Sequence, residues 1–276
     1  MDKMRFTILG CGSSPGVPRI HGDWGACDPN EPKNRRLRCS LLVERIADNG
    51  ITRVVIDTSP DFREQMLAAN VPRIDGVLYT HPHADHVHGI DDLRGFALAQ
   101  QERIKIYADK NTLERLYEGF GYCLKQPEGS MYPPILDANE IVAGVAVEIK
   151  GEGGSIYALP ILQVHGPINS LGFRFSTSEN FENGGLCYSP DVSDIPKTSV
   201  QKLFLLDYWI VDALQHRPHV SHFSVSESLE WINKLAPKHS IFTHMHIPLD
   251  YNMLKTDLPQ SVEPAYDGMV LEIETS

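Results

Sequence analysis

Short apolar runs, separated by turn residues, recur along the whole chain. Ten of these runs are rich in Val, Ile, Leu and aromatic residues, which predicts strands that are at least partly buried. The predicted strands are residues 4–9, 40–45, 52–57, 75–80, 104–108, 155–163, 170–176, 185–189, 203–212 and 239–243. Helices are predicted at residues 60–70, 111–120 and 224–236. The last helix opens with a capping-box pattern, Ser224 with Glu227. Strands and helices mixed in both halves predict sheets covered by helices, an α/β or α+β layered domain.

The connections between these elements show neither a linker nor a repeat. Two stretches, 12–38 and 121–134, resemble loops but are not of low complexity. Structureless loops of that length are uncommon in compact domains and are usually functional. We therefore expect one continuous domain over residues 1–276.

Composition narrows the class of protein. Apolar residues make up 42% of the 276 positions and charged residues 22%, a globular mixture that excludes a disordered or fibrous chain. The 25 Lys and Arg against 36 Asp and Glu give a net charge of −11. That charge repels nucleic acid at long range, although it allows a local basic pocket.

Cysteine usage and the start of the chain indicate the compartment. The five cysteines are an odd number without a CxxC spacing, and the N-terminus enters an apolar strand without a signal-peptide pattern. No apolar stretch approaches the 18 residues of a membrane span. We expect a cytoplasmic protein with reduced thiols and no membrane partner.

Histidines cluster after the fourth predicted strand, where His81, His83, Asp85 and His86 form an HxHxDH motif. Two histidines at i and i+2 on a chain leaving a strand can face the same way and hold one cation. The Asp and His one turn further on can reach a second cation. Imidazole and carboxylate groups suit Zn²⁺, Mn²⁺ or Fe²⁺. A polar surface loop is the alternative, but such a loop has no reason to follow a buried strand with this pattern.

The motif resembles that of the metallo-β-lactamase superfamily, and the resemblance covers nearly the whole chain. It implies a four-layer αββα sandwich with a dinuclear metal site along one edge of the sheets. The segments similar to the phosphoribosyl 1,2-cyclic phosphate phosphodiesterases of this superfamily are LGCGSSPGVP at 9–18, RRLRCS at 35–40, HFS at 222–224 and THMH at 243–246.

This resemblance implies two metal sites that share one carboxylate. The implied ligands are His81, His83 and His165 for the first metal, Asp85, His86 and His244 for the second, and Asp191 as the bridge. Each candidate follows an apolar run and is therefore expected at a sheet edge, where sites collect. Asp194 competes with Asp191, but its position is more typical of a helix cap. We expect two divalent cations per chain, Mn²⁺ or Zn²⁺, with Fe²⁺ as a further option.

Two residues are implied to support the ligands. Asp57 ends a predicted strand and would orient a ligand imidazole. His222 matches a non-ligand histidine of this branch, which would donate a proton to a phosphate oxygen or to the leaving alkoxide. We group His222 with Asp85 as catalytic residues; a surface histidine at a helix cap is the alternative for His222.

The segment 28–38 is the one dense basic patch of the chain. Arg35 and Arg36 suit bidentate phosphate contacts, and Ser13 and Ser14 offer backbone amides to an anion. We expect these four residues to bind substrate, with a solvated loop as an equally weighted alternative.

Relatives in the phosphonate branch often bind a structural zinc just before the basic segment. This chain keeps only Cys27 of that cysteine cluster, with His246 as a further candidate ligand of an extra metal. Because four ligands are the rule for structural zinc, an extra metal here is the less favoured option, and packing of Trp24 is the alternative means of holding this loop.

The favoured function is metal-dependent hydrolysis of a small cyclic or nucleotide-like phosphodiester. A tRNase Z-like RNA 3′-processing enzyme is one alternative, but the 26 positions between His165 and Asp191 leave no room for a tRNA-gripping arm, and the acidity disfavours RNA. A thioester or lactone hydrolase would use the same metals without needing the basic segment. A homodimer is left open.

Overall fold

The computed structural model describes residues 2–126 and 128–274, which form two seven-stranded β-sheets. The first sheet has the order β14 (Val270–Glu274), β1 (Lys3–Gly10), β2 (Ser40–Ala47), β3 (Gly50–Ile56), β4 (Gly76–Leu78), β5 (Ile104–Ala108) and β6 (Leu136–Glu140). The second has the order β13 (Val262–Pro264), β12 (His239–Thr243), β11 (Tyr208–Asp212), β10 (Leu186–Ser189), β9 (Ile168–Ser176), β8 (Ile156–His165) and β7 (Val147–Ile149). The outermost residues of the expected 1–276 domain, residue 1 and residues 275–276, lie outside the described residues.

Alternation along the central strands explains why the first sheet needs cover on both faces. In β2, Leu41 and Val43 are buried in the core between the sheets, whereas Leu42 points to the opposite face. The neighbouring strand β3 matches this pattern, because its register pairs Leu41 with Ile56 and Val43 with Val54. The first sheet is therefore apolar on both sides and must be covered on its outer face.

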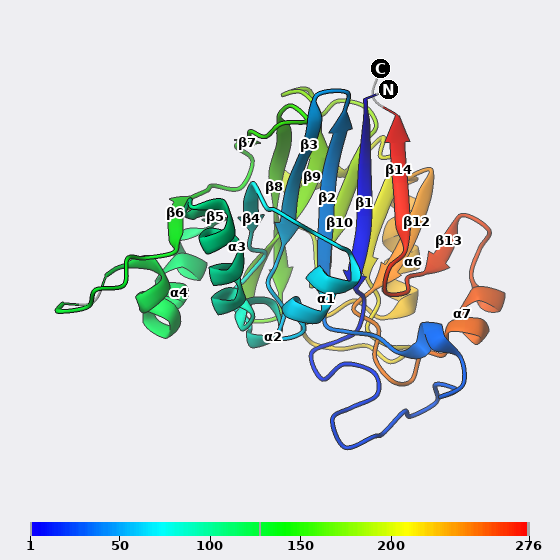
Figure 1. Cartoon of the computed structure of the whole chain (residues 1–276). Coiled ribbons are helices and arrows are strands. Elements are labelled where there is room, and N and C mark those ends of the chain that lie inside the picture. Colours follow the sequence, from blue (N-terminus) through cyan, green and yellow to red (C-terminus); the bar gives the residue numbers. More distant parts are fainter. Residues whose placement is uncertain (1, 127, 275–276) are drawn as a thin grey trace.

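Helices supply that cover. Four of these helices are α1 (Phe62–Ala68), α3 (Leu93–Gln100), α4 (Lys110–Leu124) and α6 (Val225–Leu235). α1, α3 and α4 pack on the outer face of the first sheet through residues such as Phe62, Leu93 and Leu116, and α6 lies on the side of the second sheet (Figure 1). This arrangement confirms the αββα sandwich. Among the described residues, no helix has both the length and the apolar character needed to cross a bilayer.

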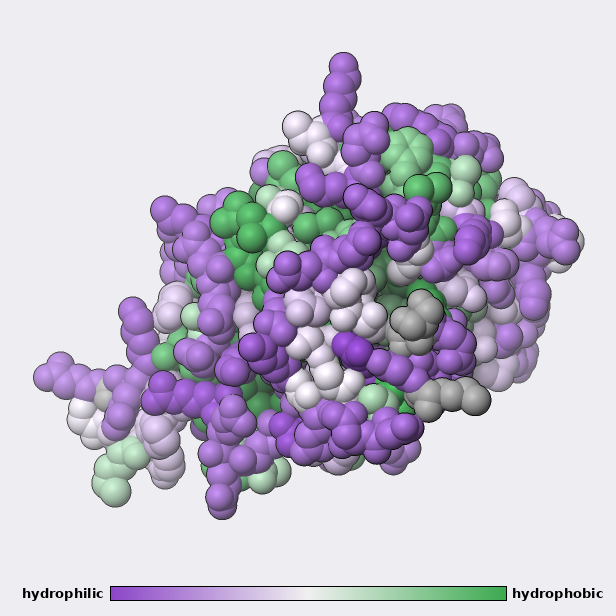
Figure 2. All heavy atoms as spheres, turned by 90° about the horizontal axis from the view of Figure 1, so that it is seen from above, coloured by the Kyte–Doolittle hydropathy of each residue, from purple (hydrophilic) through white to green (hydrophobic). Residues whose placement is uncertain are grey.

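The two ends of the sandwich differ. β1 pairs antiparallel with β14, so the start of β1 and the end of β14 lie together at one end of the molecule (Figure 1). Seen from this end, the surface carries many hydrophilic residues (Figure 2). At the other end lies the short helix α2 (Ala84–Val87). β3 runs parallel to β4, and β10, β11 and β12 run parallel to one another. The residues that follow these five strands therefore meet at one edge.

Several element boundaries differ from the sequence prediction. The strand expected at 203–212 begins only at Tyr208, because 201–203 is a 3₁₀ turn and Leu205 has a φ of 58°. α4 continues to Leu124 through a kink at Phe120, so the loop expected from residue 121 starts later. The edge strands β6, β7, β13 and β14, and the helices α2, α3, α5 (Lys197–Val200) and α7 (Tyr251–Asp257), are not predicted. Most of these are short or polar, and periodicity signals little in such segments.

Candidate metal centre

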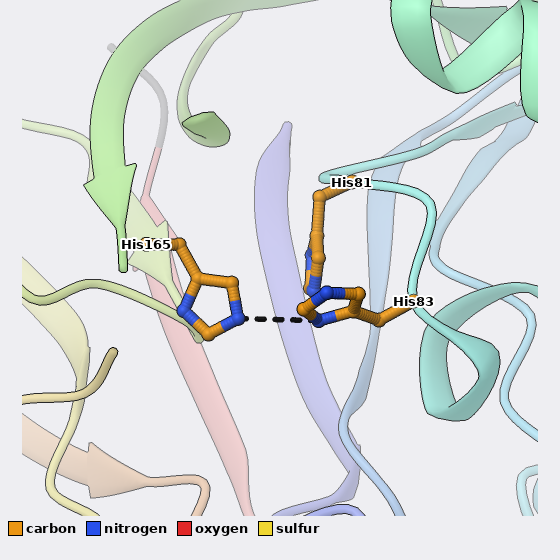
Figure 3. A group of neighbouring side chains, drawn as sticks. All are labelled: His81, His83 and His165. Carbon is orange, nitrogen blue, oxygen red and sulfur yellow. Dashed lines mark hydrogen bonds between the residues drawn. The ribbon is translucent and has the colours of Figure 1, made fainter. Parts of the chain in front are cut away.

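Three histidines converge from the two sheets to form the first ligand group. His81 and His83 follow β4, and His165 ends β8 (Figure 3). Their ring centroids lie 4.6 to 5.0 Å apart. Nδ1 of His165 donates to the carbonyl of Ser221 at 2.6 Å, which leaves Nε2 as a lone pair directed at Nδ1 of His83, 3.2 Å away. Nitrogen atoms of His81, His83 and His165 lie close enough together to ligate one cation.

A second group lies beside the first. Asp85 and His86 come from α2, and His244 follows β12. The Asp85 carboxylate lies 3.4 Å from Nε2 of His86 and 3.7 Å from Nε2 of His244. These three atoms are close enough to ligate one metal ion.

Asp191 joins the two groups. It follows β10, is 2% exposed, and its two oxygens face different histidines. Oδ2 lies 3.0 Å from Nε2 of His86, and Oδ1 lies 3.7 Å from Nε2 of His165. Asp194, the competing carboxylate, is not part of any candidate ligand group in the described residues, and its backbone carbonyl pairs with Val164 instead. The carboxylate expected to bridge is therefore the one that lies between both groups.

The polar atoms at this edge fit divalent cations. Nε2 of His81 and both ring nitrogens of His244 are buried and have no hydrogen-bond partner within residues 2–126 and 128–274. Burying such atoms without a partner costs free energy, so their convergence at this edge fits a divalent cation better than a packed core. Nitrogen and carboxylate oxygen donors without a thiolate suit Zn²⁺, Mn²⁺ and Fe²⁺.

The electrostatics of the edge also favour positive charge. Burial lowers the pKa of His81 well below its usual value and that of His165 to about 4, so both rings are neutral and can ligate. Burial acts the same way on His86, but the carboxylates of Asp191, Asp85 and Asp57 outweigh it and raise the pKa of His86 well above its usual value. These carboxylates therefore favour a positive charge at this edge, which a bound metal ion would supply.

Asp57 holds a ligand imidazole, in the place where the sequence predicts it. Its Oδ2 lies 2.6 Å from Nδ1 of His86, and both oxygens accept hydrogen bonds from Thr80. Asp57 and His244 both adopt positive φ, 63° and 56°, although neither is glycine. Such backbone conformations cost about 1–3 kcal/mol and collect at functional sites.

His222 lies against the second group and has a partner that the sequence analysis missed. Its ring stacks on His244 with centroids 4.5 Å apart, and its Nδ1 lies 2.7 Å from Oδ2 of Asp212. Burial lowers the pKa of His222, whereas burial and the nearby Asp191 raise the pKa of Asp212. Asp212 ends the apolar strand β11 as Asp57 follows β3, and that shared pattern is the signal that would have found it.

The four residues expected to bind substrate differ in their exposure to solvent. Ser14 and Arg35 are exposed, and Ser13 is buried with Oγ 2.7 Å from Nδ1 of His246. Arg36 is 1% exposed and donates to the Leu249 carbonyl at 2.6 Å. The expectation that Arg36 clamps phosphate is therefore corrected, because its guanidinium is used inside the loop.

An extra metal at Cys27 and His246 is also not supported. Cys27 Sγ lies 3.4 Å from the carbonyls of Ile247 and Leu249, and His246 is engaged by Ser13 and Arg19. Neither residue belongs to a candidate ligand group of the described chain. Burial and, to a smaller extent, the Arg19 charge lower the pKa of His246 to about 4, so this ring is a neutral structural partner.

The sandwich and its histidine–carboxylate edge together define a metal-binding hydrolase of the metallo-β-lactamase fold. A model of the β-lactamase superfamily domain matches residues 52–245, and the chain belongs to this family. It falls in the phosphodiesterase branch, as its motifs predict.

Three known proteins illustrate the relationship. A crystal structure described as a new diphosphatase from the PhnP family is 34% identical, with a TM-score of 0.85 and coverage of 99% of this chain and 98% of that one. The short form of human tRNase Z is 17% identical, with a TM-score of 0.65 and 98% coverage of both chains, which shows a shared fold. An octanoyltransferase of Porphyromonas gingivalis is 30% identical over 271 residues, 96% of this chain. The chain spans about half (51%) of that relative.

Proposed function

We propose that this protein is a dinuclear metal-dependent phosphodiesterase that hydrolyses a small cyclic or nucleotide-like phosphodiester. The observation that carries the proposal is the position of Asp191 between two ligand groups, with its oxygens 3.0 Å from His86 and 3.7 Å from His165. A carboxylate in that position can hold two cations a few ångströms apart, the arrangement that in-line displacement at phosphorus uses.

The bound pair of Mn²⁺ or Zn²⁺ ions would polarise the phosphoryl oxygens and supply a hydroxide at neutral pH. The contribution of the chain is to fix that pair. Asp57 orients His86, and Ser221 orients His165, so both rings present Nε2 to the centre. Such partners fix the tautomer and the ring direction of a ligand histidine.

His222 is the proposed proton donor to the leaving group. Its contact with Asp212 ties down Nδ1 and leaves Nε2 for the substrate. Only a poorly stabilised alkoxide needs that proton, because an aryl leaving group departs as a stable anion. We expect the role of His222 to depend on the leaving group for this reason.

The similarity to a PhnP-family diphosphatase supports reaction at phosphorus. Diphosphate linkages and phosphodiesters are both cleaved by displacement at phosphorus, so the same two-metal arrangement serves each. A thioester or lactone hydrolase would act at a carbonyl carbon; the octanoyltransferase relative gives this weaker support, because the chain spans only 51% of that protein.

RNA processing is the less favoured candidate. The chain between His165 and Asp191 is occupied by β9, a nine-residue loop at 177–185 and β10, which is too short for an arm that would grip tRNA. The net charge of −11 also weakens the phosphate contacts on which RNA binding depends.

The test is a substrate panel assayed with Mn²⁺ and with Zn²⁺. We expect hydrolysis of cyclic and linear nucleotide phosphodiesters, loss of at least about 10²-fold in Asp191→Asn, and near-wild-type rates in the matched control Asp194→Asn. Activity confined to thioesters or lactones would contradict the proposal, and cleavage of a tRNA precursor alone would favour the RNA reading.

A further inference from the structure

An exposed histidine, His219, lies beside the proposed proton donor and has no part in the reaction described above. Its ring centroid is 5.4 Å from that of His222, and the two ring planes are tilted by 43°. The ring of His222 in turn lies 4.5 Å from that of His244 and 4.7 Å from that of His165. These ring distances place His219 at the rim of the centre, next to His222.

One side of the His219 ring is held by Ser221. The backbone N–H of Ser221 donates to Nδ1 of His219 at 3.3 Å, and Ser221 Oγ lies 3.2 Å from the same nitrogen. A backbone N–H can only donate, so Nδ1 accepts and the hydrogen of the neutral ring is on Nε2. The carbonyl of Ser221 accepts from His165. The same residue therefore orients a proposed metal ligand and the ring of His219.

The other side of the ring is available to a ligand. His219 is exposed, whereas His222 is 8% exposed. Within residues 2–126 and 128–274, the hydrogen bonds of the His219 ring all involve Nδ1. The N–H at Nε2 is left to water, and a ligand oxygen can replace that water at little cost.

We propose that His219 binds the leaving group of the substrate, by donating from Nε2 to a hydroxyl oxygen near the leaving oxygen. An alcohol with a second hydroxyl then leaves in preference to a plain alkanol. This inference rests on the proposed function, because it takes His222 as the proton donor to the leaving oxygen. A ring beside that donor and further from the ligand groups meets the leaving alcohol, and a neutral N–H suits a hydroxyl oxygen.

Two esters that differ by one hydroxyl test the inference: adenosine 5′-(2-hydroxyethyl) phosphate and adenosine 5′-ethyl phosphate. Formation of AMP from either breaks the P–O bond to the alkyl oxygen and consumes one water. The leaving oxygen takes up a proton, which gives ethylene glycol or ethanol. We expect the wild type to favour the hydroxyethyl ester about 3- to 10-fold in kcat/KM for AMP formation, the contribution of one neutral hydrogen bond. Any intrinsic difference between the esters is the same for every variant and cancels in the comparison.

Two substitutions at this position separate a ligand donor from a residue that only holds its loop. His219→Asn keeps an acceptor near the position of Nδ1 and removes the outer donor. His219→Gln keeps a donor near the position of Nε2 and removes that acceptor. We expect the preference to disappear in His219→Asn, through a slower hydroxyethyl ester, and to remain in His219→Gln.

The matched control is His216→Asn, which replaces an exposed histidine of the same loop. We expect it to change neither ester and all variants to keep the metal content of the wild type. A preference that survives in His219→Asn or is lost in His219→Gln would overturn the inference. Loss of metal in either variant would do the same, because it would show that His219 acts by holding Ser221.

A binding measurement decides the matter without turnover. In calorimetric titrations of the zinc-loaded protein, we expect the wild type to bind 2-hydroxyethyl phosphate about 3- to 10-fold more tightly than ethyl phosphate. In His219→Asn we expect the two affinities to agree within about twofold. Equal affinities in the wild type would overturn the inference. A wild type that cleaves neither adenosine ester would contradict the proposed function instead, and the titration would still decide the assignment of His219.

Discussion

Replacing Asp212 with Asn changes one charge in the contact that positions the proposed proton donor. The substitution keeps the size of the side chain, and its amide oxygen can still accept from His222 Nδ1 and from the Val192 amide, which lie 2.7 Å and 3.1 Å from Oδ2 of Asp212. What is lost is the carboxylate that stabilises His222 when Nε2 also carries a proton.

A hydrogen bond to a charged group contributes about 1.5–3 kcal/mol, which corresponds to about 10- to 100-fold in rate. We expect Asp212→Asn to lower kcat by that factor for a methyl or nucleoside ester of a phosphodiester. For a p-nitrophenyl ester we expect less than about threefold, because the phenolate leaves without a proton.

The assay is kcat for both esters together with metal content by elemental analysis. Asp212, His222 and His244 lie close enough to form a ligand group of their own, so metal content distinguishes the two roles. Loss of metal in Asp212→Asn would make Asp212 a ligand. Equal slowing of both esters would show that the pair does not deliver a proton to the leaving group, and either result refutes the reasoning.

Three further predictions follow from other contacts. His222→Ala should keep its metal and lose about 10²–10⁴-fold on alkyl esters, whereas His244→Ala should lose metal from the second group, both measured by kcat and metal stoichiometry. Arg36→Ala should lower the free energy of unfolding by about 2–4 kcal/mol in chemical denaturation while leaving KM nearly unchanged, because its bonds to Leu249 and Asn34 are buried. Burial raises the pKa of Asp267 to about 7, so its contribution favours folding below about pH 4 and is lost as pH rises through 7. Asp267→Asn should therefore flatten the decline of stability between pH 4 and 7, and an unchanged slope would contradict this.

The parts of the fold that the sequence predicts are those with strong periodicity. The buried strand that ends directly before Asp57 and the capped helix after Ser224 follow from local patterns, and the structure confirms both. Edge strands such as β13, with three residues that include Pro264, carry too little pattern to be recognised. Their place is set by neighbouring strands and not by local propensity.

The candidate ligands can be proposed from the sequence because a metal centre needs specific donor types at strand ends, and the structure brings these donors together at one edge. Asp212 is missed because it belongs to no spaced motif, and its place at the end of the apolar strand β11 is the one local signal that marks it. Arg36 is misplaced for a different reason, since composition identifies a basic segment but not which of its arginines turns inward. Arg19 lies outside that segment, and no pattern in the sequence singles it out. Only the structure shows that it contacts His246.

The central claim is that Asp191 joins two metal ions in one site. Elemental analysis of protein dialysed after saturation with Mn²⁺ or Zn²⁺ tests it most directly, with wild type, Asp191→Asn and Asp194→Asn compared in parallel. We predict two ions per chain in the wild type and in Asp194→Asn, and reduced occupancy of both positions in Asp191→Asn. One ion per chain in the saturated wild type, or two ions retained in Asp191→Asn, would contradict the account.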